Sequence, residues 1–148
     1  MIKILLITKN NNYWQELISY AQNCPWRAGK SLANKMQAEY FTDWQRVIIG
    51  LIDNQIVGFA TFVETDSIEN TGYCPFIGYI YVDQKYRGKR ISQLMINEAI
   101  GYAKTMEFKK VYIHSGEIGL YEKFGFKEIG KANSRLGELE TIYEKSII

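Results

Sequence analysis

The first part of the chain divides into apolar and polar blocks that predict one strand followed by two helices. An aliphatic run over residues 2–7 predicts the strand. Three consecutive asparagines then supply helix-capping side chains, and they predict a helix over about 12–23 that ends before Pro25. A second helix is predicted over 29–41, because apolar residues recur there at every fourth position.

The middle of the chain predicts a hairpin, a further strand and a long amphipathic helix. In "RVIIGLIDNQIVGFATFVET", residues 46–65, two apolar runs flank the turn-forming residues 53–55, which is typical of a β-hairpin. The run "FIGYIYVD" over 76–83 predicts another strand. Apolar residues then follow one stripe through 90–105, so this segment predicts a helix that is buried along one side.

The last part of the chain predicts three strands and one short helix. The strands are expected over 109–114, 126–132 and 139–147. Between the first two, the segment 117–125 is typical of a short helix that ends at its final glycine, Gly125.

This order of elements predicts a single α+β domain of mixed α/β type. We expect a central, mostly antiparallel, twisted sheet of about seven strands flanked by four helices. The helix over 90–105 connects two strands that we expect to be parallel, because a crossover connection of this length joins parallel neighbours.

Composition narrows the function classes without naming one. The 148 residues fit one domain, and a net charge of +2 is too small to indicate a nucleic-acid-binding protein. Two cysteines without metal-ligand spacing and a single histidine argue against a zinc site and against a disulfide framework. We therefore expect no metal and no nucleic-acid partner.

The N-terminal apolar run lacks the cleavage pattern of a signal peptide. No apolar run approaches the roughly 20 residues that span a bilayer. We expect a cytoplasmic protein without a membrane partner.

Four cations surround one glycine in "KYRGKR", at the point where the helix over 90–105 begins. A loop and a helix start form a natural anion site, because the first backbone N–H groups of a helix lack intrahelical partners and the helix dipole is positive there. Gly88 permits close approach of the backbone, and the cations add charge-assisted hydrogen bonds. The alternatives are a solvated surface turn or a nucleic-acid contact. The glycine spacing matches neither a P-loop nor a Rossmann fingerprint.

The stretch "YIYVDQKYRGKRISQLMINEA" resembles the acyl-CoA-binding motif of the GNAT superfamily of N-acetyltransferases. That motif has Arg or Gln, two residues, Gly, one residue, and Gly or Ala. Arg87 matches its first position, whereas Arg90 and Ser92 stand where the small residues are usual. The resemblance implies that the CoA pyrophosphate is bound by Arg87 and by the backbone of Gly88, Lys89, Arg90, Ile91 and Ser92.

A second block, "GLYEKFGFKEIG", resembles the Leu-Tyr-x-x-x-Gly-Phe segment of the same family. Tyr121, Gly125 and Phe126 all fit, while His114 replaces an asparagine that is often found seven residues before the tyrosine. The two blocks identify 46–146 as an acyl-CoA-binding core. Residues 1–45 then correspond to the variable helices on the acceptor side.

The resemblance also implies roles for residues outside the cationic loop. Tyr121 is expected to donate a hydrogen bond or proton to the CoA sulfur as the thioester collapses. Main-chain groups of Ile80, Tyr81 and Val82 are expected to pair with the pantetheine arm, as an added strand would. We also expect Lys123 to contact CoA.

The general base is less well defined by the sequence. Glu64 and Asp66 lie near the end of the third predicted strand, and Tyr79 and Tyr81 are candidates to hold a water. His114 is the alternative base, because imidazole titrates in the useful range. Each of these side chains has an ordinary structural interpretation as well.

The expected activity is that of an N-acetyltransferase, which moves an acetyl group from acetyl-CoA to a primary amine of a small molecule or peptide by direct attack in a ternary complex. A non-catalytic acyl-CoA-binding module is the alternative. Acceptor specificity is expected to lie in residues 1–45, with Trp26 and Arg27 near the pocket, and in the loop 66–75. A homodimer is possible if the last strand, over 139–147, is exposed.

Overall fold

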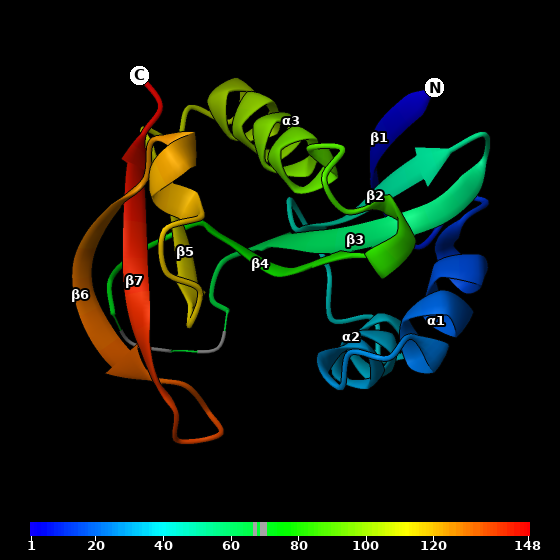
Figure 1. The fold of residues 1–148 in the computed structure, drawn as a ribbon, viewed down its shortest axis with the longest axis horizontal. Coiled ribbons are helices and arrows are strands. Elements are labelled where there is room, and N and C mark those ends of the chain that lie inside the picture. Colours follow the sequence, from blue (N-terminus) through cyan, green and yellow to red (C-terminus); the bar gives the residue numbers. More distant parts are fainter. Residues whose placement is uncertain (67, 69–70) are drawn as a thin grey trace.

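The computed structural model describes residues 1–66, 68 and 71–148. Within them the strands form one seven-stranded sheet in the order β1-β2-β3-β4-β5-β7-β6 (Figure 1). The strands are β1 (Ile2–Ile7), β2 (Arg46–Ile52), β3 (Gln55–Val63), β4 (Phe76–Val82), β5 (Lys110–Ser115), β6 (Lys127–Asn133) and β7 (Leu139–Ser146). Neighbouring strands are antiparallel except for β4 and β5, so the predicted fold class and the parallel crossover are confirmed.

The helices are α1 (Trp14–Asn23), α2 (Ala28–Gln37) and α3 (Ile91–Thr105), and η1 (Gln84–Tyr86) and η2 (Tyr121–Phe124) are short 3₁₀ helices. The fourth predicted helix is thus a single 3₁₀ turn, η2, which ends as expected because Gly125 takes a left-handed conformation with φ 91°. None of the described helices is long and apolar enough to cross a membrane.

The helix α2 ends at Gln37, four residues earlier than the 29–41 prediction. Glu39 has φ 56°, and Tyr40 donates its backbone N–H to the carbonyl of Lys35 at 3.0 Å. This is a Schellman motif, in which a left-handed residue reverses the chain and satisfies the last carbonyls. The helix therefore stops at a backbone motif and not at the end of the apolar pattern.

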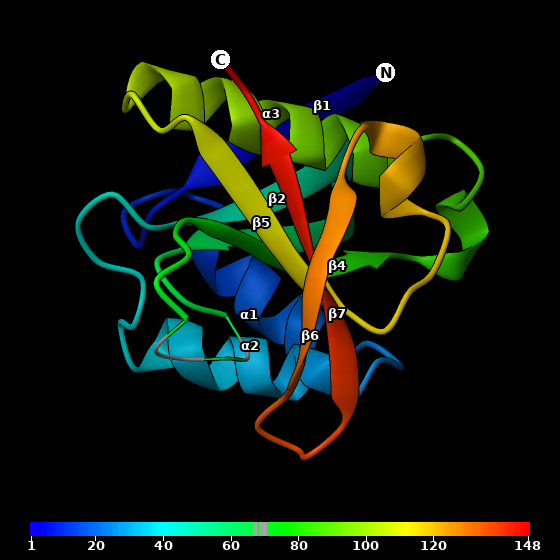
Figure 2. The same ribbon diagram turned by 90° about the vertical axis from the view of Figure 1, so that its left-hand side faces the viewer.

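The helices cover both faces of the sheet (Figures 1 and 2). One buried cluster joins α1 and α2 to residues such as Phe59 and Val63 of β3. A second cluster joins α3 to the alternate positions Ala60 and Phe62 of the same strand. This alternation follows from the two-residue period of a strand, and it defines two sides of the molecule, called here the α1/α2 side and the α3 side.

The hairpin between β2 and β3 turns on two residues, Asp53 and Asn54, with φ values of 49° and 66°. Two positive φ values are typical of a type I′ turn, whose twist matches the flanking strands. Ile52 pairs with Gln55 directly across it, which confirms the hairpin prediction.

The strand β7 lies inside the sheet, between β5 and β6. The prediction of an exposed last strand that pairs across a dimer is therefore wrong, because both edges of β7 are already hydrogen-bonded. Three consecutive residues of β7, 141–143, are buried, whereas β6 contains no buried residue and forms the edge.

Candidate active site

Within the described residues, the recorded pairing of β4 with β5 is confined to the start of β4. Their recorded register is Phe76 opposite Tyr112, and Tyr112 donates its N–H to the carbonyl of Pro75 at 3.0 Å. Beyond this point the two strands run in different directions (Figure 1). The divergence opens a cleft with a volume of about 1350 Å³. Its walls come from the α1–α2 turn and α2, β4, the start of α3, β5 with the loop after it, and the β6–β7 loop.

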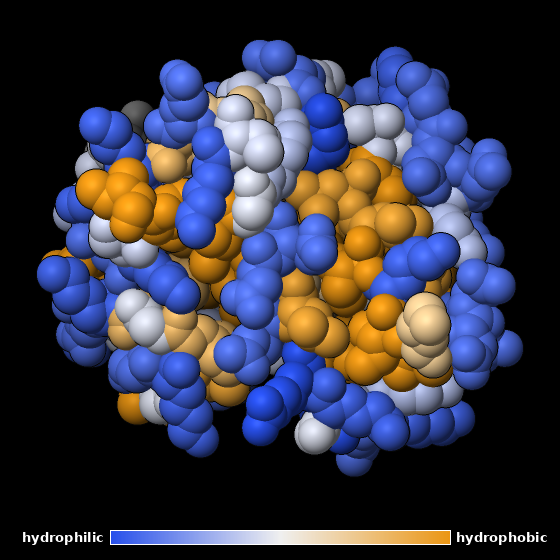
Figure 3. Space-filling view, turned by 90° about the horizontal axis from the view of Figure 1, so that it is seen from above, coloured by the Kyte–Doolittle hydropathy of each residue, from blue (hydrophilic) through white to orange (hydrophobic). Residues whose placement is uncertain are grey.

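The cleft passes through the sheet and has one end on each side of it. Along β4, Ile80 and Val82 pack with the α3 cluster, whereas Tyr79 and Tyr81 pack with the α1/α2 cluster. Tyr121, which also lines the cleft, belongs to the α3 cluster. Viewed from above, the face over α3 shows hydrophobic areas on both sides of a band of hydrophilic residues (Figure 3).

The cationic loop forms the α3 end of the cleft. Gly88 has φ 84°, and Arg90, at the N-cap of α3, is left-handed with φ 63°. Within the described residues, no side chain caps the first turn of α3 by a hydrogen bond from this position. The first N–H groups of the helix are thus available to a ligand, as the sequence pattern predicts.

Arg90 keeps a conformation that glycine adopts more easily. A left-handed backbone costs a non-glycine residue about 1–2 kcal/mol. Arg90, which stands where the resembled motif has a glycine, therefore keeps the path of the loop and adds backbone strain to it. Arg87, by contrast, is anchored, because its Nε donates to the carbonyl of Val82 at 3.0 Å.

A β-bulge shapes the wall that β4 contributes. The register with β3 shifts between Gly78 and Tyr81, so that β4 has one extra residue, and Tyr79 has φ 47°. A bulge bends and twists a strand and changes the direction of its side chains. Here it lies next to the point where β4 has lost its partner β5, and one edge of the strand therefore faces the cleft.

Tyr121 is buried at the first turn after β5, with 5% of its surface exposed. Its ring lies edge-on to the rings of Phe124, Phe126 and Tyr143. Burial raises the pKa of Tyr121 to about 12, although a hydrogen bond with the Ser115 side chain acts in the opposite direction. The phenol therefore keeps its proton at neutral pH and is able to donate it.

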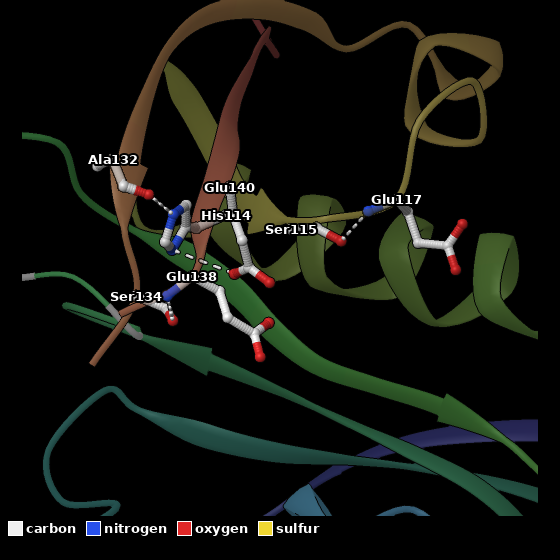
Figure 4. A network of polar contacts seen from close by, with 7 residues as sticks. All are labelled: His114, Ser115, Glu117, Ala132, Ser134, Glu138 and Glu140. Carbon is white, nitrogen blue, oxygen red and sulfur yellow. Dashed lines mark hydrogen bonds and ion pairs between the residues drawn. The ribbon is translucent and has the colours of Figure 1, made fainter. Parts of the chain in front are cut away.

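His114 lies on the α1/α2 side, where β5, β6 and β7 meet (Figure 4). Its Nε2 is 3.0 Å from the carbonyl oxygen of Ala132, and its Nδ1 is 3.9 Å from Oε1 of Glu140. The imidazole is fully buried, whereas 23% of the Glu140 side chain is exposed. The second carboxylate oxygen of Glu140 lies 3.4 Å from the position of a Cβ added to Gly116.

Three more carboxylates line the cleft, namely Asp66, Glu117 and Glu138. Asp66 is buried, with 8% exposure, and its carboxylate lies over Gly78 of β4. Glu117 and Glu138 are exposed residues. Asp66 is predicted from the sequence, whereas Glu117, Glu138 and Glu140 are not, because no local motif marks them and only the sheet brings them together.

Aromatic residues form the wall at the α1/α2 end. Trp26 stacks on Tyr81, with ring centroids 5.8 Å apart and an interplanar angle of 6°, and it meets Tyr79 edge-on at 6.2 Å. The hydroxyls of Tyr79 and Ser31 are hydrogen-bonded at 2.7 Å. Trp26 and Arg27 both line the cleft.

Most of the residues predicted for the site lie in this cleft. Those that line it are Ile80, Tyr81, Val82, Arg87, Gly88, Arg90, Ile91, Ser92, His114 and Tyr121. Glu64, Lys89 and Lys123 are exposed and do not line it. Of the predicted specificity loop 66–75, residues 67, 69 and 70 lie outside the described residues.

The model of the acetyltransferase (GNAT) family matches residues 13–126. The chain therefore belongs to this family. No curated protein matches the chain.

Solved structures of acetyltransferases have the same fold over the whole chain. Aminoglycoside 6′-acetyltransferase type Ii is 17% identical, with a TM-score of 0.77 and coverage of 99% of this chain and 97% of that one. An aminoglycoside 6′-N-acetyltransferase in complex with coenzyme A is 15% identical, with a TM-score of 0.75 and coverage of 99% and 97%. A GNAT family acetyltransferase from Elizabethkingia anophelis with acetyl-CoA bound is 17% identical, with a TM-score of 0.68 and coverage of 98% and 97%.

Proposed function

We propose that this protein is an N-acetyltransferase that moves the acetyl group of acetyl-CoA to a primary amine of a small molecule or peptide, by direct attack in a ternary complex. Family membership supports acyl transfer, and the bound CoA and acetyl-CoA of two similar structures support the donor. The observation that carries the proposal is the cleft between β4 and β5, which joins an anion-binding helix start on one side of the sheet to an aromatic and acidic pocket on the other.

The donor binds on the α3 side in this proposal. The backbone N–H groups over 88–92 hold the pyrophosphate, where the helix dipole and Arg87 add favourable charge. Lys89 and Lys123 are exposed. In this proposal they contribute to binding through the attraction of their positive charge for the phosphates of CoA.

The pantetheine arm follows β4. This strand loses β5 as a partner after Phe76, so its open edge offers main-chain groups to an extended ligand. Ile80 remains a proposed main-chain partner, whereas the carbonyl of Tyr81 lies against Gly58 of β3 and not at the open edge. The carbonyl of Val82 accepts a hydrogen bond from Arg87, so Val82 contributes chiefly through its N–H and its apolar side chain.

Tyr121 is the proposed acid for the leaving thiolate. It lies on the α3 side with its phenol protonated, because burial raises its pKa to about 12. As the C–S bond breaks, the hydroxyl stabilises the charge that develops on sulfur.

The acceptor amine enters from the α1/α2 side. Trp26, Tyr79 and Tyr81 present ring faces and edges that bind the body of an amine, and aromatic faces attract cations. Glu64 does not line the cleft and is exposed, so we assign it no part in proton transfer. His114 and the carboxylates of the cleft are the remaining candidates for this step.

The donor site is tested by thermal unfolding with acetyl-CoA, CoA and dephospho-CoA at matched ionic strength. A ligand that binds only the folded state adds about 2.7 kcal/mol to the free energy of unfolding at a hundred times its Kd. Arg87→Ala should reduce the stabilisation by all three ligands. Lys104→Ala is the control, because it removes one exposed positive charge at the other end of α3. This variant should be stabilised by the three ligands as much as the wild type is. Absence of stabilisation by any of the three would contradict the donor assignment.

Transfer itself is tested by incubating the protein with acetyl-CoA and a panel of primary amines that includes amino acids, polyamines, aminoglycosides and short peptides. Free thiol and the acetylated product are measured together. Binding of acetyl-CoA without transfer to any amine would favour the non-catalytic acyl-CoA-binding module.

A further inference from the structure

We propose that Glu140 takes the proton of the acceptor amine and that His114 acts as the positioning residue that holds this carboxylate ready. The proposal rests on the proposed acetyl transfer. Glu140 takes the role of general base that was expected for Glu64, which lies outside the cleft. His114, expected as the alternative base, becomes the partner of the base.

Glu140 has an ion-pair contact with His114 and open space beside Gly116. Its Oε1 faces Nδ1 of His114 at 3.9 Å, which is an ion-pair distance. Its Oε2 lies near Gly116, where the missing side chain leaves room for the carboxylate, because a Cβ there would stand 3.4 Å from this oxygen. With 23% of its side chain exposed, Glu140 remains within reach of a ligand in the cleft. Figure 4 shows its carboxylate between His114 and the strand that leads to Glu117.

Each ring nitrogen of His114 has an oxygen acceptor near it. Nε2 donates to the carbonyl of Ala132, which can only accept, so a proton on Nε2 is required for this hydrogen bond. Nδ1 then faces the carboxylate of Glu140. The pair thus has two places for one additional proton, namely Nδ1 of the imidazole and the carboxylate of Glu140.

The other carboxylates of the cleft fit this role less well. The Asp66 carboxylate is packed against β4, where it occupies the space over Gly78. Glu117 and Glu138 are exposed, and the hydrogen bonds recorded for them use their backbone N–H and carbonyl groups. Other charged groups that line the same cleft are Asp66, Glu117, Arg135 and Glu138.

The alternation of side chains along β5 and β7 places His114 and Glu140 on the α1/α2 side, where the proposed acceptor binds. Tyr112, two residues before His114 on β5, packs in the α1/α2 cluster, as does Ile142, two residues after Glu140 on β7. Residues two apart in a strand point to the same face. The pair and the proposed acid Tyr121 therefore act on opposite sides of the reacting carbonyl.

The proton transfers balance as follows. The ammonium R–NH₃⁺ gives one proton to Glu140, and the neutral amine forms a C–N bond to the thioester carbonyl carbon. The C–S bond then breaks, the sulfur receives a proton from Tyr121, and the nitrogen loses a second proton that restores the phenol. One proton ends on the CoA thiol, and the proton held by the His114–Glu140 pair leaves to solvent.

The pair is tested first without any acceptor. His114 is the single histidine of the chain, so its ¹⁵N resonances are assigned without ambiguity. In Glu140→Gln the ¹⁵N chemical shift of Nδ1 at pH 7 should differ from that of the wild type, because the carboxylate that faces Nδ1 becomes a neutral amide. Glu98→Gln, an exposed position on α3 that does not line the cleft, should give the wild-type chemical shifts. Unchanged chemical shifts in Glu140→Gln would overturn the pairing, whether or not the protein acetylates amines.

The proton transfer is tested with the best amine from the panel. Glu140→Gln should lower kcat/KM for this amine about 10²–10⁴-fold at pH 7, with an unchanged KM for acetyl-CoA. The loss should shrink at high pH, where the amine is already neutral. His114→Gln should lose less and should shift the acidic limb of the pH profile. Retention of activity in Glu140→Gln, with the loss appearing instead in Asp66→Asn, would overturn the assignment. A wild-type protein that acetylates no amine contradicts the proposed function itself.

Discussion

The carboxylate of Asp66 occupies the space in which a side chain of Gly78 would stand. A Cβ built on Gly78 meets the Asp66 carboxyl carbon and both oxygens at 2.5 Å. A glycine is therefore required at position 78 because the Asp66 side chain fills the adjacent space, and not because the backbone has a positive φ there. The contact fixes one wall of the cleft at the point where the bulge of β4 begins.

Gly78→Ala should destabilise the protein, because the added methyl forces the buried Asp66 side chain to move. We expect a loss of about 1–3 kcal/mol in the free energy of unfolding, measured by urea denaturation. Gly101→Ala is the control, since a Cβ on Gly101 of α3 meets nothing within 4 Å. It should stabilise the helix by about 0.5–1 kcal/mol. Equal changes in the free energy of unfolding for the two substitutions would show that a methyl group on Gly78 does not disturb Asp66.

Arg90→Gly should relieve strain in the ligand-free protein, because Arg90 is left-handed with φ 63°. Lys89→Gly removes the same charge from a neighbour without a positive φ. We expect Arg90→Gly to be more stable than Lys89→Gly by about 1 kcal/mol, measured by thermal unfolding. The opposite order would mean that the Arg90 side chain makes a stabilising contact that outweighs its backbone strain.

Tyr121→Phe should slow transfer about 10²–10⁴-fold while the affinity for CoA stays nearly unchanged. The ring is retained, so its contacts with Phe126 and Tyr143 are kept, and only the proposed proton donor is lost. The measurements are kcat with acetyl-CoA and the best amine, and Kd for CoA by calorimetry.

Tyr102→Phe is the control for this substitution. Its hydroxyl donates to the carbonyl of Trp44 at 2.8 Å, away from the residues that line the cleft. It should lower stability by about 1 kcal/mol and leave kcat unchanged. Wild-type kcat in Tyr121→Phe would remove this residue from the mechanism.

The pH dependence of Tyr121 follows from its environment. The folded protein raises its pKa from 10.0 to about 12, chiefly by burial. The folded state therefore binds this proton more tightly than the unfolded state does. Its contribution to the free energy of unfolding is fully present below pH 10 and is lost as the pH rises through 12.

Ultraviolet titration measures this directly. The difference between the tyrosinate absorbance of the wild type and that of Tyr121→Phe should show one phenol that titrates near pH 12. A component near pH 10 in the difference curve would mean that the phenol is solvated, and it would weaken the case for a buried proton donor.

Local patterns predict the local elements of this fold well. The hairpin at Asp53–Asn54 and the end of η2 at Gly125 depend on residues that tolerate positive φ, so their positions can be found in the sequence. The cationic loop before α3 likewise combines a strand end, a glycine and a helix start within a few residues. Each of these features is determined by residues that are close together in the sequence.

Strand order and the acidic part of the site depend on contacts between distant segments. The position of β7 inside the sheet is set by its pairing with both β5 and β6, which no local pattern states. One signal was present, because "TIYE" carries apolar residues at consecutive positions, as an inner strand does. Glu140 comes within reach of His114 only through this pairing, so its place in the site cannot be found from the sequence.

Neighbouring positions at the end of β5 face opposite sides of the sheet. His114 faces the proposed acceptor, whereas Ser115 contacts Tyr121 on the donor side. A slip of one residue in the pairing of β5 with β7 would exchange these two side chains between the faces of the sheet. Insertions or deletions within β5 should therefore abolish activity even where the strand itself still forms.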